Sequence, residues 1–219
     1  QRQPEQGFVA DVLHANRWAT LPFCLHSAAE QAAGLAPPGL VQARLRIRAM
    51  FDRLSAFREA DGLAVAMVGV GEAVQGCAAA AARHKPARLQ ALVLLDGRAD
   101  QVSHHLLRLN VPTLFVLGQA DKRLVAKHRQ ATRDISTRQR TEVLRQGTGA
   151  RPAQGAMEAF ACLTMGWLEG PGRPAARSVR LRATQRAGPG RLSPLRPSGV
   201  ATAVPRARQQ AGRRQPARR

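Results

Sequence analysis

Short apolar runs alternate with longer segments of helical period between Gly7 and Leu168. This alternation is typical of a parallel sheet whose strands are joined by crossover helices. Strands are predicted at Trp18–Leu25, Leu63–Val70, Leu89–Leu95, Thr113–Leu117 and Thr141–Leu144. The middle three are almost uninterrupted apolar runs, as expected of strands buried on both faces. The predicted fold class is therefore α/β, with a mostly parallel sheet and helices on both faces.

Helices are predicted in the intervening segments. The clearest is Leu40–Ala60, where apolar residues recur at steps of three and four while arginines occupy the opposite face. The other helices are predicted at Phe8–Asn16, Ala73–His84, Arg123–Thr132 and Gln154–Leu168. Because the chain opens in a helix, we expect the first strands of the sheet to be missing and the sequence to be an N-terminally incomplete domain.

The net charge of +20 is unevenly distributed along the chain. Residues 171–219 contain 13 arginines and no acid, so residues 1–170 carry only the remaining +7. Few large apolar residues occur in the C-terminal segment, and such a composition does not offset the entropy of ordering. We therefore predict an α/β domain at residues 1–170 and a disordered Arg/Pro/Ala/Gly-rich tail at residues 171–219.

The tail has three interpretations. Its positive charges favour weak electrostatic binding of nucleic acid, because neutralising phosphates releases counterions. A solvated tail without function is the second interpretation, since charge runs without a motif are usually solvated. The third is the product of a shifted reading frame in GC-rich DNA, which is enriched in the same residue types.

The cysteines, Cys24, Cys77 and Cys162, are far apart and lack the paired spacing of a zinc site. Neither a metal nor a cofactor is predicted. No apolar run approaches the roughly 18 residues that a membrane span needs, and Gln1–Gln6 lacks the pattern of a signal peptide. With reduced cysteines and no export signal, a cytoplasmic location is expected.

Three segments carry candidate chemistry. The segment Val68-Gly69-Val70-Gly71-Glu72-Ala73 joins a strand to a helix that contains the alanine run Ala78–Ala82, and the next strand leads into Asp96-Gly97-Arg98-Ala99-Asp100. The third segment reads Val111-Pro112-Thr113-Leu114-Phe115-Val116-Leu117-Gly118-Gln119-Ala120-Asp121. In this order they resemble the dienelactone-hydrolase-like family of α/β-hydrolases, including members found beside phosphoribosyltransferase domains.

The resemblance assigns three positions of a catalytic triad. Gly71 falls on the nucleophile, Asp121 on the acid and Ala150 on the histidine, while the backbone N–H of Glu72 falls on the oxyanion site. Glycine has no side chain with which to attack a carbonyl, and alanine cannot transfer a proton. The nucleophile and the histidine are thus lost, and the triad is incomplete.

The leading hypothesis is an α/β-hydrolase-fold protein of carboxylic-ester or lactone hydrolase descent that is catalytically impaired and retains a site for a small ester or lactone. One alternative is an active dienelactone-hydrolase-like enzyme with a displaced nucleophile. Another is a basic nucleic-acid-binding protein that acts through its tail.

Other residues are candidates for a dinucleotide-binding or catalytic site. Gly69, Gly71 and Gly76 have a Gly-x-Gly-x-x-x-x-Gly spacing, which departs from the dinucleotide-binding fingerprint. Cys77 should lie inside a helix, so packing is its expected role. None of the histidines His84, His104, His105 and His128 follows a predicted strand, where open α/β sheets bind their ligands.

Overall fold

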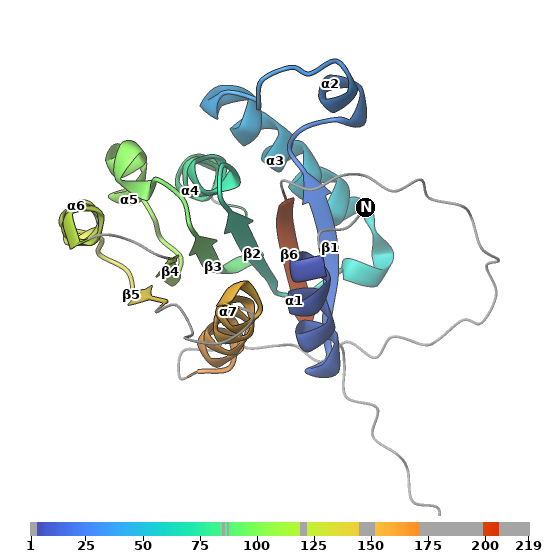
Figure 1. Cartoon of the computed structure of the whole chain (residues 1–219). Coiled ribbons are helices and arrows are strands. Elements are labelled where there is room, and N and C mark those ends of the chain that lie inside the picture. Colours follow the sequence, from blue (N-terminus) through green and yellow to red (C-terminus); the bar gives the residue numbers. More distant parts are fainter. Residues whose placement is uncertain are drawn as a thin grey trace, which may run out of the picture.

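The computed structural model describes residues 4–84, 86, 88–118, 122–144, 152–170 and 199–205. Within these residues the strands form one sheet in the order β1-β6-β2-β3-β4-β5 (Figure 1). The strands are β1 (Trp18–Cys24), β2 (Val65–Val70), β3 (Leu89–Leu95), β4 (Thr113–Leu117), β5 (Gln139–Val143) and β6 (Gly199–Pro205). β2, β3, β4 and β5 are parallel, whereas β6 is antiparallel to both of its neighbours.

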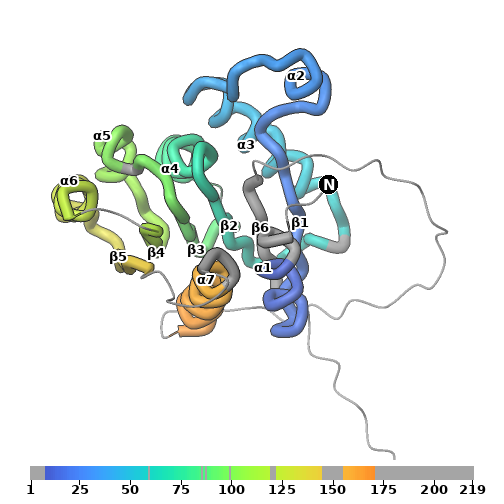
Figure 2. Tube along the Cα trace, in the orientation of Figure 1, coloured from blue at the N-terminus to red at the C-terminus, as the bar shows by residue number. Residues whose placement is uncertain are grey.

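The helices cover both faces of the sheet. In Figures 1 and 2, α3, α4, α5 and α6 lie on one face, and α1 and α7 lie on the other. The α-helices are α1 (Pro4–Ala15), α2 (Ala28–Ala32), α3 (Leu40–Ala56), α4 (Ala73–His84), α5 (Ser103–Leu106), α6 (Lys122–Thr132) and α7 (Pro152–Glu169). Two 3-10 turns, at Arg58–Ala60 and Ala99–Val102, complete the connections.

Alternate residues of the central strands enter two separate apolar cores. Met67 and Leu92 pack with α3 and α4 on one face, while Val68 and Val93 pack with α1 and α7 on the other. All four side chains are almost fully buried. Burial of such a side chain stabilises a fold by about 1.5–3 kcal/mol, so the apolar runs that predicted these strands also account for their place in the middle of the sheet.

Small residues set the close approach of α4 to its neighbours. A Cβ atom on Gly69 would lie 2.7 Å from Cys77 Sγ, and one on Gly76 would lie 2.9 Å from the Cβ atom of Ala43 in α3. The alanine run Ala78–Ala82 is buried along the same helix. The glycines and alanines of this region therefore place the first turn of α4 directly above the end of β2.

The predicted elements between residues 7 and 168 are confirmed, with small shifts at their ends. The strand expected at Thr141–Leu144 runs from Gln139 to Val143, and the helix expected at Leu40–Ala60 gives way to a 3-10 turn after Ala56. The short helix α2 was not predicted. Its N-terminus is a capping box in which Ser27 and Glu30 bond to each other's backbone N–H groups.

The structure differs from the predicted tail at Gly199–Pro205, which forms β6 between β1 and β2. Each residue of β6 has a partner in β1, and four of them also have a partner in β2. These seven residues are uncharged and include three β-branched side chains, a local composition that favours a strand. The strand was not predicted because the prediction used the average composition of residues 171–219. The rest of the predicted tail, residues 171–198 and 206–219, lies outside the described residues.

Candidate functional site

The predicted nucleophile position lies in a tight turn between β2 and α4. Gly71 has φ +59°, a left-handed conformation that glycine adopts without steric cost. The N–H of Gly71 donates to the carbonyl of Leu95 over 2.8 Å, and its carbonyl accepts from the N–H of Val74 over 3.2 Å. These bonds hold the turn against the end of β3 and start the helix immediately beyond it.

Space is available where a nucleophilic side chain would stand. An ideal Cβ atom built on Gly71 meets no heavy atom within 4 Å. Glu72 follows at an exposed position, directly before the first residue of α4. The backbone N–H groups at a helix N-terminus carry partial positive charge and are suited to binding an anionic oxygen. The turn therefore has room for a larger side chain at the predicted nucleophile position, close to the N-terminus of α4.

A non-glycine residue with positive φ lies at the same edge of the sheet. Asp96 follows β3 with φ 55°, and its N–H donates to the carbonyl of Val116 over 3.0 Å. Its carboxylate accepts a hydrogen bond from the N–H of Gly118, directly after β4. A side chain at residue 118 would collide with this carboxylate. Asp96 thus ties the carboxyl ends of β3 and β4 together next to the elbow.

The hydrogen bond from Gly118 to Asp96 was not predicted from the sequence, where Asp96 was named only as the first residue of the segment after the strand Leu89–Leu95. Its sequence signal is the Asp96-Gly97 pair directly after an apolar run. A Cβ atom on Gly97 would overlap Val74 of α4, so this glycine is required for close packing under the elbow. The small residues after β2 and after β3 therefore indicate that the ends of these two strands pack closely against the start of α4.

The other two triad positions, Asp121 and Ala150, lie outside the described residues. Their flanking elements are described. Asp121 falls between the end of β4 and the start of α6, and Ala150 falls between β5 and α7. Whether the side chain of Asp121 reaches Gly71 stays a prediction.

Cys77 has no access to a substrate. Cys77 lies in α4, and its side chain is fully buried against β2. Burial raises the pKa of the thiol well above its usual range. A protonated, inaccessible thiol is not a nucleophile. The prediction that Cys77 packs in the core is confirmed.

The four histidines considered as candidate sites, His84, His104, His105 and His128, lie in helices rather than at strand ends. His128 of α6 is buried with its ring against Phe115, at 4.9 Å between centroids. The rings of His104 and His105 in α5 contact each other at a tilt of 45°, with 3.9 Å between their centroids. His84, at the end of α4, contacts Arg44. Within the described part of the chain, no three His, Cys, Asp or Glu residues are grouped as a metal site would require.

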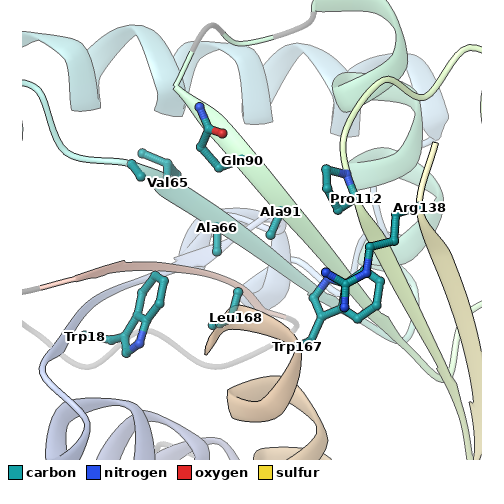
Figure 3. A pocket seen from close by; sticks show the side chains of 10 residues that line it. Trp18, Val65, Ala66, Gln90, Ala91, Pro112, Arg138, Trp167 and Leu168 are labelled. Atoms are coloured by element: carbon teal, nitrogen blue, oxygen red, sulfur yellow. The ribbon is translucent and has the colours of Figure 1, made fainter. Parts of the chain in front are cut away.

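A small cavity lies at the opposite, amino-terminal edge of the sheet (Figure 3). Trp18 and Trp167 line it together with Val65, at the start of β2, and Gln90. The Arg138 guanidinium stacks on Trp167, 4.4 Å from the ring centroid. The cavity has room for about one water molecule. It is separated from the elbow by the length of β2, so it is not part of the candidate active site.

Comparisons with known proteins agree with this geometry. No family model matches the chain, and no curated protein matches it. The structure is similar to that of dienelactone hydrolase from Anabaena variabilis, with a TM-score of 0.63 and 21% sequence identity. The similarity covers 76% of this chain and 78% of that one. No helix among the described residues is long and apolar enough to cross a membrane. The chain thus has an α/β-hydrolase fold of the dienelactone hydrolase type.

Proposed function

We propose that this protein is an α/β-hydrolase-fold protein of ester or lactone hydrolase descent that binds a small ester or lactone without hydrolysing it. The observation that carries the proposal is Gly71. It occupies the left-handed turn after β2 with open space above it, where the fold presents its nucleophile. A turn of this shape without a hydroxyl or thiol forms no acyl-enzyme.

Retained binding is supported by the groups that remain at the carboxyl edge of the sheet. Open α/β sheets bind ligands at this edge, and here it contains the start of α4 and the tied ends of β3 and β4. The backbone N–H groups at the N-terminus of α4 would donate hydrogen bonds to the carbonyl oxygen of an ester or lactone. Ala150, at the histidine position, removes the group that would transfer the proton.

The two alternatives lack a supporting observation. For a displaced nucleophile, the nearest thiol to the elbow in the chain, Cys77, is fully buried. For nucleic-acid binding through the tail, the described part of that segment is the uncharged strand β6.

Restoring the triad tests the proposal. Hydrolysis of p-nitrophenyl acetate would be measured for the wild type, for Gly71→Ser with Ala150→His, and for Gly71→Ala with Ala150→His. The last variant adds the same Cβ atom without a hydroxyl and is the matched control. We expect wild type and control at the buffer rate, and the serine variant at least about tenfold faster, because nucleophile and base act as a unit. Turnover by the wild type equal to that of the serine variant would refute the proposal.

A further inference from the structure

The two helical layers of the sheet have opposite charge. Helices α3, α4 and α6 together contain nine lysines and arginines and one carboxylate, Asp52. Helix α5, between α4 and α6, contains neither. One of the nine, Arg46, forms an ion pair with Glu30 of α2. Helices α1 and α7 contain no lysine or arginine, and Asp11, Glu158 and Glu169 lie on them. An arginine excess caused by genome composition alone would reach both layers. The segregation therefore indicates a surface property of the α3–α6 layer.

Basic residues from different helices meet on this layer. Arg44 of α3 lies 3.3 Å from the His84 ring at the end of α4, measured from Nη1 to Nε2. Burial, followed by the nearby charges of Arg44, Arg48 and Arg83, lowers the pKa of His84. Asp52 reaches only Arg48, at 3.7 Å on an exposed pair. The positive charge of this corner is thus mostly uncompensated.

Helix α6 extends the basic surface across β4 and β5. Lys122, Arg123, Lys127 and Arg129 are all exposed. Among the described residues, no carboxylate forms an ion pair with any of these four. The other exposed residues of α6 are Ala126 and Gln130, so this helix offers no large apolar side chain for insertion into a membrane.

We infer that the α3–α6 layer is a binding surface for nucleic acid, which it contacts through phosphates. Four adjacent helices at the usual spacing of 8–10 Å extend over roughly 30 Å, which suits a row of phosphates better than a single small anion. Guanidinium groups bind phosphate oxygens in a planar, bidentate geometry. Recognition is independent of base sequence, since the layer presents charges rather than groups that read base edges.

The test is fluorescence anisotropy of a labelled 30-base-pair DNA duplex and of RNA of the same length, with the full chain at several salt concentrations. One variant reverses two charges on α6, Arg123→Glu with Arg129→Glu. A second, Arg83→Glu with Arg108→Glu, reverses exposed charges in the last turn of α4 and shortly after α5. The matched control, Arg213→Glu with Arg214→Glu, makes the same change in net charge within the C-terminal segment. Circular dichroism establishes that each variant is folded.

We expect both layer variants to bind at least about tenfold more weakly and to show a shallower dependence of affinity on salt, because fewer counterions are released. The control should stay within about twofold of the wild type. The inference is overturned if the control loses as much affinity as the layer variants. It is also overturned if the wild type binds neither the DNA nor the RNA. Binding to vesicles of anionic lipid, without binding to either nucleic acid, counts as the same outcome.

Discussion

At the scale of single residues, Gly71 allows the left-handed turn after β2 but has no side chain that could react with a substrate. A serine in the left-handed region is strained by about 1 kcal/mol or more relative to glycine. Enzymes tolerate such strain where it positions a reacting group. Gly71 has the same backbone conformation without that strain, and Asp96 beside it shows that this corner still accepts a non-glycine residue at positive φ. The proposed loss of a nucleophile at this position would therefore leave the turn intact.

A buried histidine makes the stability of the fold depend on pH. Burial lowers the pKa of His128, although the charge of Asp100 raises it, and Nδ1 has no hydrogen-bond partner among the described residues. Since an unfolded histidine titrates near pH 6.5, the unfolded chain binds the extra proton first. The contribution of neutral His128 to stability is present above about pH 6.5 and is lost as the pH falls.

We therefore expect His128→Met to reduce the loss of unfolding free energy between pH 7.5 and pH 5 by about 1 kcal/mol. Methionine fills the same apolar site without titrating. Urea unfolding at both pH values measures the effect, and His14→Met, at an exposed position, is the control. An unchanged pH dependence in His128→Met would contradict the assignment. Burial also lowers the pKa of His84 and His105, so a reduced dependence should remain.

At the scale of elements, the apolar pattern predicted the central strands, which are buried on both faces of the sheet. The strands Leu89–Leu95 and Thr113–Leu117 were predicted to the residue, because each is an almost uninterrupted apolar run. Strand β6 was not predicted, since its short uncharged run lies in an arginine-rich environment and its place depends on two strands far away in sequence. Pairing across such a separation leaves no periodic signal in the chain itself.

The position of β6 is testable with a native thiol. Gly199 is the β-sheet partner of Cys24. Antiparallel partners have Cα atoms about 4.5–5.5 Å apart, a separation that a disulfide spans. In a Cys162→Ser background, which removes an exposed thiol, we expect Gly199→Cys to form an intramolecular disulfide with Cys24 on mild oxidation.

The control is Val200→Cys, since adjacent residues of a strand point to opposite faces and Val200 is paired with Phe23. Intact mass and peptide mapping under non-reducing conditions identify the bond. Equal cross-linking of both variants, or a bond only between two chains, would contradict the described register of β6 within one chain.

At the scale of the whole molecule, the order of the elements was predictable from the sequence. The arrangement of residues at the carboxyl edge of the sheet was predictable only in part. The chain order of Gly71, Asp121 and Ala150 follows from local motifs. The carboxylate of Asp96 meets Gly118 only after β3 and β4 pair, and the opposite charges of the two layers emerge only when α1 and α7 lie on one face. Contacts between distant segments therefore define both the candidate site and the proposed nucleic-acid surface.

The central claim is that this hydrolase scaffold has no activated nucleophile, and covalent labelling tests it most directly. Wild-type protein would be incubated with a fluorophosphonate, which forms a stable adduct with an activated serine, and its intact mass measured before and after incubation. We expect an unchanged mass, equal to that of heat-denatured protein under the same treatment. The addition of one phosphonyl group at a single residue, abolished by heat, would contradict it.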